Sequence, residues 1–271
     1  MSTQVQPVGS VLVVIPTYNE ADNLELVIGR LRAAVPAADV LVADDNSPDG
    51  TGEVADRLAA ADSQVHVLHR AAKQGLGAAY VAGFGWGLER GYDILVEMDA
   101  DGSHQPEQLP DLLAALAEAD MVKGSRWMRG GSVVDWDKKR EFLSRGANIF
   151  VQGVMDIPVH DSTGGFNVFR SSILRAIDLG DISVKGYAFQ IDMTRRVLEA
   201  GGTVAEVPIV FQEREFGVSK MGGSIIGEAI MNTVRWGAER RGEQLKLLGA
   251  RLGEWAAPLV TKIKTHRSSA G

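Results

Sequence analysis

The chain has 271 residues, of which 45% are hydrophobic and 23% are charged, and it contains no cysteine. This length and composition suffice for a large globular core and exclude a disordered or collagen-like chain. The lack of cysteine excludes disulfides and thiolate chemistry, so any metal must be bound by oxygen or imidazole. No apolar run approaches the roughly 18 to 20 residues of a membrane-spanning helix, and we expect no signal peptide.

The formal net charge of -7 is unevenly distributed along the chain. Residues 235–271 hold eight Lys and Arg against three acidic residues, whereas the preceding part is acidic. An acidic body argues against nucleic acid as the main partner, because duplex binding depends on clustered Lys and Arg. The basic end, with Trp255 and leucines at helical spacing, predicts contact with an anionic membrane surface.

The first hundred residues contain four short β-branched runs, at 11–15, 40–43, 65–68 and 94–96. Each is followed by Pro, Asp or Gly and then by a segment of helix length. Runs this continuous suit strands buried on both faces, so the sequence predicts an open parallel sheet covered by helices. Ligands of such sheets bind outside the carboxyl ends of the strands. We therefore expect four polar loops to converge there: PTYNE at 16–20, DDNSPD at 44–49, KQGLG at 73–77 and DAD at 99–101.

Further along, the pattern predicts a helix from 106, a short strand at 120–123, a basic stretch at 126–140 and a helix running to 155. A loop at 161–165 precedes an expected strand at 166–169, a helix near 188–199, a strand at 203–211 and a polar loop at 212–220. No repeat or Pro/Ser linker marks a second domain. We expect one catalytic domain over residues 1–241 and a basic amphipathic tail over residues 242–271.

The carboxylates of Asp99 and Asp101 directly follow a buried run. Residues i and i+2 of an extended segment lie on the same side, so both can face one hard divalent cation or one diphosphate. The alternative is an acidic turn that caps the next helix, with Asp101 or Ser103 as N-cap. Their place at the end of a parallel strand favours the cation site.

Asp44 and Asp45 end another strand, before the turn sequence NSPDG. An Asp here can accept hydrogen bonds from the N–H groups of a nucleobase, with turn formation alone as the alternative. Tyr18 could pack against a base, and Glu20 could accept from a ribose or base group. The alternative for this segment is a helix start with Asn19 as N-cap, and both can be true.

Other candidate motifs are weaker. GLGAAY at 75–80 resembles a dinucleotide fingerprint, but Tyr80 stands where the third Gly belongs. Arg214 and Lys220 flank a Gly-containing loop, where two cations suit a diphosphate and a solvated pair is the alternative. The five histidines show no metal-ligand spacing, and we assign them no role.

Nine segments in this order resemble the polyprenol-phosphate mannosyltransferases, the dolichol-phosphate-mannose synthase group of glycosyltransferase family 2: PTYNE, VADDNSPDGT, KQGLGAAY, MDADGSHQPE, KGSR, SRGAN, DSTGGF, GYAFQID and REFGVSK. The resemblance spans about residues 11–225. It implies an α/β GT-A fold, with a mostly parallel open sheet, helices on both faces and a nucleotide-sugar site at the carboxyl ends of the strands. It also implies GDP-mannose as donor, a polyprenyl phosphate as acceptor, and Mg²⁺ or Mn²⁺.

Carried onto this sequence, the resemblance implies that five residues surround the guanosine: Pro16, Tyr18, Glu20, Ala43 and Asp45. Asp99, Ala100 and Asp101 would meet the ribose and diphosphate, with Asp99 and Asp101 on the metal. The position two residues after Asp101 binds the metal in some members and is Ser103 here.

The resemblance also assigns the cations. Arg126 would reach the sugar or the acceptor phosphate, while Arg214 and Lys220 would close over the diphosphate. Together with Asp101, these three are the expected catalytic residues.

The expected reaction needs no general base, because a phosphate monoester has a second pKa of about 6 and is mostly dianionic at neutral pH. The protein must hold this dianion near a donor of like charge and stabilise the departing diphosphate. We expect single displacement with inversion, by a peripheral protein on the cytoplasmic face of a membrane. The alternatives are transfer of glucose to the same lipid phosphate and a catalytically silent membrane-associated adaptor.

Overall fold

The first hundred residues alternate strand and helix. The computed structural model describes residues 9–182, 186–213 and 227–242. Its first elements are β1 (Val11–Thr17), α1 (Ala21–Ala34), β2 (Asp39–Asp44), α2 (Thr51–Ala61), β3 (Val65–His69), α3 (Leu76–Glu89) and β4 (Ile94–Glu97). The four predicted strands are confirmed, each within a few residues of its expected bounds.

The second half departs from simple alternation. It contains η1 (Pro106–Gln108), α4 (Leu109–Ala115), β5 (Met121–Ser125), β6 (Ser132–Val134), α5 (Lys138–Met155), β7 (Asn167–Arg170), α6 (Ser171–Ala176), η2 (Leu179–Asp181), α7 (Tyr187–Glu199), β8 (Val204–Pro208) and β9 (Val210–Gln212). Residues 227–242 form a further helix, called helix 227–242 below.

Two expectations for this half were wrong. The single strand expected at 203–211 is two strands, because the chain leaves β5 after the bond from Ile209 N to Ser125 O and pairs with another strand from Val210 on. β9 pairs instead with β6, a strand inside the basic stretch for which no regular structure was predicted.

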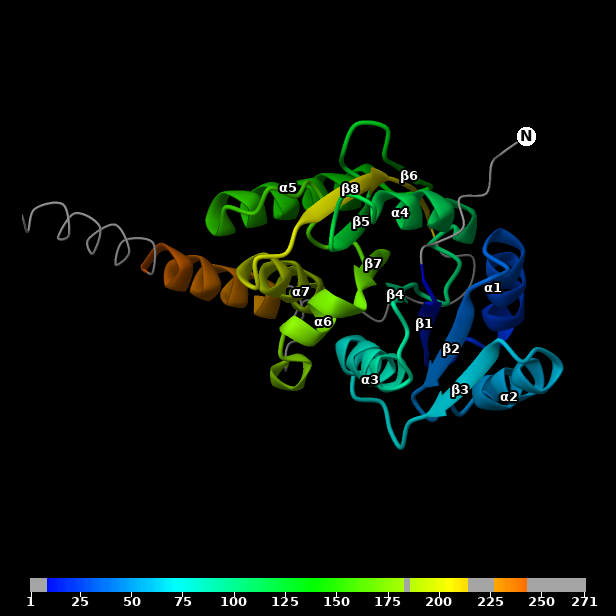
Figure 1. Ribbon diagram of the computed structural model, residues 1–271. Helices are drawn as coiled ribbons and strands as arrows, with labels where there is room; N and C mark the ends of the chain where they lie inside the picture. The colour runs from blue at the N-terminus through cyan, green and yellow to red at the C-terminus, as the bar shows by residue number, and fades with distance from the viewer. Residues whose placement is uncertain (1–8, 183–185, 214–226, 243–271) are drawn as a thin grey trace, which may run out of the picture.

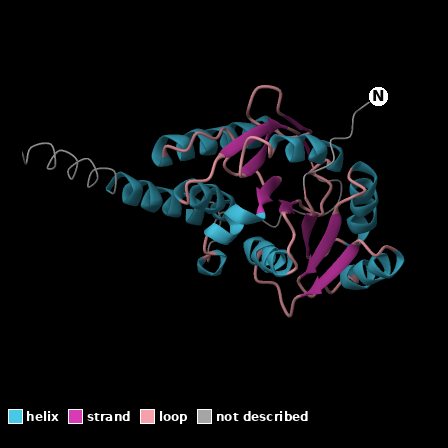
Figure 2. Cartoon of the chain, in the orientation of Figure 1, coloured by secondary structure: helices cyan, strands magenta, loops and turns pink. Residues whose placement is uncertain are grey.

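Seven strands form one twisted sheet in the order β3-β2-β1-β4-β7-β5-β8 (Figures 1 and 2). β1, β2, β3 and β4 pair in parallel, and β5 pairs in parallel with β8. β7 is antiparallel to both of its neighbours, β4 and β5. The predicted fold class, an α/β protein with a mostly parallel open sheet, is confirmed.

Helices cover both faces of the sheet (Figure 1). One face buries apolar side chains of α1, α2 and α4, and the other buries those of α3, α6 and α7. A third apolar cluster joins α5, α7 and helix 227–242, through Val151, Ile191 and Trp236 among others. The described helices include none that is both long enough and apolar enough to cross a bilayer.

Candidate active site

One edge of the sheet collects the polar loops. β1, β2, β4 and β5 all end there, because they run in the same direction. β7 runs in the opposite direction, so its first residue lies at this same edge. The edge therefore receives the predicted loops after β1, β2 and β4, and also the segment 161–165 that precedes β7.

The predicted nucleoside residues lie at the ends of β1 and β2. Pro16 and Ala43 are register partners in these two strands, and both are buried. Tyr18 follows β1, and the Nζ atom of Lys73 lies 3.9 Å from the centroid of its ring. Glu20 directly precedes α1. The loops after β1 and β3 therefore meet at this end of the edge.

The Asp45 carboxylate is held by residues that follow β3. It forms an ion pair with Arg70, and it accepts a hydrogen bond from the backbone N of Gln74 at 3.4 Å. Burial raises the pKa of Asp45, and the guanidinium of Arg70 opposes this shift. Sequence reasoning missed this partner, although Arg70 stands one residue beyond β3.

The segment after β4 brings Asp99 and Asp101 to the centre of the edge. Asp99 Oδ1 accepts from the hydroxyl of Tyr80 at 2.8 Å. Asp101 Oδ1 accepts from the backbone N and the hydroxyl of Ser103, at 3.1 Å and 2.6 Å. Ala100 is buried between the two acids. Neither Asp101 nor Ser103 caps the next helical turn, because the residue before η1 is Gln105.

His104, to which we assigned no role, supports this segment. Its Nδ1 accepts from the backbone N of Asp99 at 3.0 Å, and its ring stacks on Phe166 with centroids 5.1 Å apart. Burial lowers the pKa of His104. A neutral ring that accepts at Nδ1 carries its proton on Nε2. The histidine therefore holds the backbone at Asp99, where the two-carboxylate segment begins.

Arg126 follows β5 and is held by a buried carboxylate. Its Nε and Nη2 atoms donate to the two oxygens of Asp161 at 2.6 Å and 2.7 Å, and its backbone N donates at 3.0 Å. Burial alone would raise the pKa of Asp161, but the adjacent Arg126 and its hydrogen bonds keep this pKa below its usual value. The guanidinium is therefore a fixed cation. Asp161 opens DSTGGF, one of the segments that carry the family resemblance, but it was assigned no catalytic role.

Aromatic rings and a second arginine surround this ion pair. The guanidinium of Arg126 lies 5.5 Å and 5.6 Å from the ring centroids of Trp127 and Trp136. Arg140 lies 3.8 Å from the ring of Trp136, and its side chain pairs with Glu213. Arg126 is buried, so its charge is poorly screened by water and interacts more strongly with an anion, whereas the side chain of Arg140 is 35% exposed.

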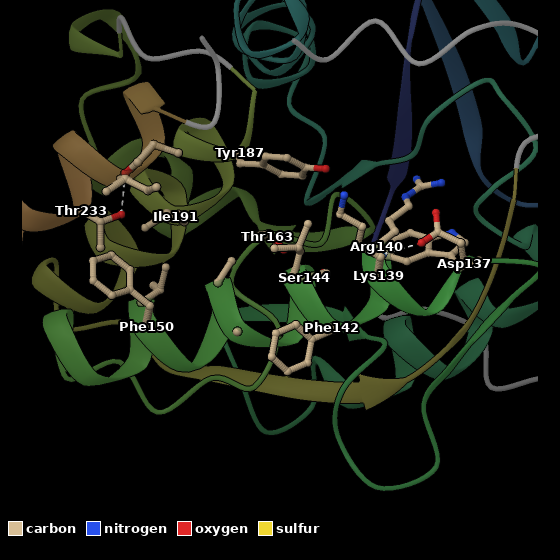
Figure 3. Close-up of a pocket in the computed structure, with 17 residues that line it drawn as sticks. Asp137, Lys139, Arg140, Phe142, Ser144, Phe150, Thr163, Tyr187, Ile191 and Thr233 are labelled. Carbon is tan, nitrogen blue, oxygen red and sulfur yellow. Dashed lines mark hydrogen bonds between the residues drawn. The ribbon is translucent and has the colours of Figure 1, made fainter. Parts of the chain in front are cut away.

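A pocket of about 610 Å³ opens beside the ion pair. Figure 3 shows Lys139 and Arg140 at one end, and Phe150 and Ile191 at the other. Thr163, which accepts from Arg126 Nη2 at 2.9 Å, lines the pocket between these ends. α5, α7 and helix 227–242 supply most of the remaining wall. Asp137 also lines the end with Lys139 and Arg140, which is called the cationic end below because its two cations outnumber this acid. The pocket thus combines a cationic end with an apolar interior.

Arg214 and Lys220 lie outside the described residues, as does the expected tail over residues 242–271 from residue 243 on. The closing role of Arg214 and Lys220 stays a prediction. Among the described side chains, no group of three or more His, Asp or Glu is arranged as a metal cage.

Comparison of the chain with known proteins identifies its enzyme class. Residues 12–178 match the model of glycosyl transferase family 2. An undecaprenyl-phosphate mannosyltransferase of Micrococcus luteus is 56% identical over 90% of this chain and 99% of its own length. A polyprenol monophosphomannose synthase of Mycolicibacterium smegmatis is 53% identical over 88% of this chain and 90% of its own length.

Solved structures show the same fold. Glucosyl-3-phosphoglycerate synthase from Mycobacterium tuberculosis, in complex with Mn²⁺, UDP-glucose and phosphoglyceric acid, matches with a TM-score of 0.64 and 18% identity over 85% of this chain and 80% of its own. Mannosyl-3-phosphoglycerate synthase from Rubrobacter xylanophilus matches with a TM-score of 0.59 and 21% identity over 88% of this chain and 75% of its own.

The fold and the site define a glycosyltransferase of the GT-A type. The chain belongs to glycosyl transferase family 2. The family and the group that the sequence motifs resemble are thereby confirmed.

The Arg126–Asp161 pair predicts a pH-dependent loss of stability. Because the folded-state pKa of Asp161 is lowered, its stabilising contribution is present above the unfolded-state pKa of about 4 and is lost as pH falls through the folded-state value. Asp161→Asn leaves Arg126 buried without its counter-ion, and should cost about 3–5 kcal/mol near pH 7. The difference from the original protein should shrink below about pH 4.

Urea unfolding at a series of pH values measures this difference. Asp22→Asn, which removes an exposed carboxyl from the first turn of α1, is the control and should leave the profile nearly unchanged. Equal pH profiles for the original protein and Asp161→Asn would contradict the assignment.

Proposed function

We propose that the protein transfers mannose from GDP-mannose to a polyprenyl phosphate, with inversion, to give polyprenyl-phosphate-mannose. The observation that carries the proposal is the pocket with a cationic end and an apolar interior, whose lining includes Thr163 of the segment 161–165 at the same edge of the sheet as Asp99 and Asp101. A lipid phosphate has this division between charged head and apolar chain. The names of the two relatives, a mannosyltransferase and a monophosphomannose synthase acting on such lipids, support the same acceptor and sugar.

The donor is proposed to lie along the edge from β2 to β4. Tyr18 offers a ring for stacking, while the carboxylates of Glu20 and Asp45 offer acceptors for the N–H groups of guanine and for ribose hydroxyls. The backbone at Pro16, Ala43 and Ala100 carries small or compact side chains, which allow close approach of the nucleotide. The sugar diphosphate then reaches Asp99 and Asp101.

Asp99 and Asp101 fit a divalent cation held jointly with the donor. Mg²⁺ and Mn²⁺ prefer oxygen ligands, and such ions are commonly bound by one or two carboxylates plus substrate phosphates rather than by an all-protein cage. Asp101 is oriented by Ser103, whose hydroxyl donates to it. When bound, Mg²⁺ or Mn²⁺ would offset the negative charge that develops on the departing diphosphate.

The acceptor phosphate is proposed to bind at the cationic end of the pocket. Lys139 and Arg140 line that end, and Arg126 lies behind Thr163 with Nε and Nη2 already engaged by Asp161. These cations hold a dianion close to a donor of like charge, which is the main difficulty of the reaction. Because the phosphate is already ionised near neutral pH, no side chain has to remove a proton from it.

The same helices present an apolar surface to solvent. Seven large apolar side chains exposed on α5 and helix 227–242, called the apolar helix surface below, are Phe142, Leu143, Ile149, Phe150, Ile230, Met231 and Val234. Lys138, Lys139 and Arg145 of α5 and Arg235 of helix 227–242 stand near them in the sequence. Apolar side chains with basic neighbours are typical of helices that lie in a membrane interface.

We therefore propose that the apolar helix surface seats the protein peripherally on the cytoplasmic face of an anionic membrane. An acceptor can then enter the pocket from the lipid phase without leaving it. This adds the catalytic body to the basic tail over residues 242–271 as a membrane contact.

The reaction is tested with a panel of donors and a polyprenyl phosphate. GDP-mannose should give a lipid-extractable product, and UDP-glucose should give far less. Asp101→Asn should lower turnover by about 10²-fold or more, because the charge stabilisation at the diphosphate is worth several kcal/mol. Asp111→Asn, an exposed carboxyl on α4, is the matched control. Preferred transfer from UDP-glucose, or donor binding without any turnover, would contradict the proposal.

Membrane seating is tested by sedimentation with vesicles of phosphatidylcholine and phosphatidylglycerol. Phe142 is 76% exposed and Met231 is 75% exposed. The double variant Phe142→Ser/Met231→Ser should bind the vesicles at least about tenfold more weakly, because both positions lose apolar contact with the membrane. Leu26→Ser removes a side chain that is 58% exposed on α1, and should bind normally. Equal losses of vesicle binding in the double variant and in Leu26→Ser would show that the apolar helix surface is not the membrane-binding surface.

A further inference from the structure

Four polar side chains form a row across the sheet. Glu97 on β4 is the register partner of Asn167 on β7, and Asn167 is the partner of Lys123 on β5. Lys123 is in turn the partner of Glu206 on β8. Register partners on adjacent strands point to the same face, so the four side chains lie in line. Glu97, Asn167 and Lys123 are fully buried, and the side chain of Glu206 is 8% exposed.

Asn167 connects the members of the row. Its Nδ2 donates to Glu97 Oε2 and to Gln190 Oε1, both at 2.7 Å. Its Oδ1 accepts from Lys123 Nζ at 2.9 Å. The amide thus joins an acid on β4 to a base on β5 through β7, which runs antiparallel to both.

The row also holds the segment that carries Asp161. Gly164 O accepts from Asn167 Nδ2 at 3.1 Å and from Lys123 Nζ at 3.4 Å. At the other end of the segment, Glu206 Oε1 accepts from the backbone N of Asp161 at 2.9 Å. Residues 161 and 164 are therefore both attached to the row, and Asp161 is attached to Arg126.

The charges of the row depend on one another. Burial lowers the pKa of Lys123 and raises that of Glu97, while the attraction between the two opposes both shifts. Glu206 and Asp161 are further acids close enough to favour the charged form of Lys123. Apolar residues of similar volume commonly stabilise a core as well as such buried charges do. Stability alone therefore does not account for a row of charges in this sheet.

We infer that the row Glu97–Asn167–Lys123–Glu206 positions the segment 161–165, and through Asp161 the guanidinium of Arg126, relative to Asp99 and Asp101. Lys123, Asn167 and Glu206 are thus positioning residues for the acceptor side of the site, and Glu97 links them to β4, the strand that precedes Asp99 and Asp101. Because Arg126 is assigned to the acceptor side, the effect on turnover rests on the proposed function. The effect on the segment itself rests on the contacts alone.

The test compares Lys123→Met, the double variant Glu97→Gln/Lys123→Met and the control Val122→Ala. Val122 is buried next to Lys123 on the opposite face of β5. For each protein, hydrogen exchange of residues 160–166, the midpoint of thermal unfolding, GDP binding with Mn²⁺, and kcat and KM are measured well below the unfolding temperature.

Lys123→Met should speed exchange in residues 160–166 by about tenfold or more, and should lower kcat by about tenfold to 100-fold with little change in GDP binding. The double variant no longer has Glu97 as an uncompensated acid, so its unfolding midpoint should recover in part. Its rate of hydrogen exchange in residues 160–166 and its kcat should stay close to those of Lys123→Met. The Lys123 ammonium that donates to Gly164 O is still absent in the double variant.

A purely structural row predicts the opposite pattern, and that pattern would overturn the inference. Exchange and kcat would then recover together with the unfolding midpoint in the double variant, or Val122→Ala would change them as much as Lys123→Met does. If the original protein transfers no mannose at all, the proposed function fails, whereas the exchange measurements still decide whether the row holds the segment.

Discussion

The reversed direction of β7 is the constraint on which the site depends. In a fully parallel sheet, the segment before a strand lies at the edge opposite the carboxyl ends of its neighbours. Since β7 is antiparallel to both β4 and β5, the segment 161–165 instead arrives at the same edge as Asp99 and Arg126. Asp161 is thereby placed where it can hold Arg126 by two side-chain hydrogen bonds and one backbone hydrogen bond.

In the proposed reaction, this arrangement separates the two like-charged substrates and then opposes their repulsion. Asp99 and Asp101, which follow β4, are assigned to the donor side, and the cations Arg126, Lys139 and Arg140 are assigned to the acceptor side. A fixed guanidinium needs little reorganisation when charge develops, and the rings of Trp127 and Trp136 limit the water that would screen it. The pocket extends from this point between α5, α7 and helix 227–242, so the acceptor side and the apolar helix surface share the same helices.

The features that could be predicted from the sequence are those marked by a pattern within a few consecutive residues. Buried β-branched runs identified β1 to β4, and polar residues directly after them identified the edge. The features that it missed depend on register between distant strands. The pairing of Arg126 with Asp161 spans 35 positions, and the polar row joins four strands whose order the pattern did not reveal. α5 was expected as a helix, but nothing in its local sequence indicated that Leu143 and Phe150 would line a pocket with helix 227–242.

We propose that donor and acceptor meet between the Asp99–Asp101 segment and the Arg126–Asp161 pair. A crystal structure of the protein with GDP, Mn²⁺ and the short acceptor farnesyl phosphate tests it most directly. The acceptor phosphate should lie within hydrogen-bond distance of Arg126 or Arg140, with its prenyl chain along Leu143 and Phe150. An acceptor phosphate bound away from these arginines, or a prenyl chain on another face of the molecule, would contradict it.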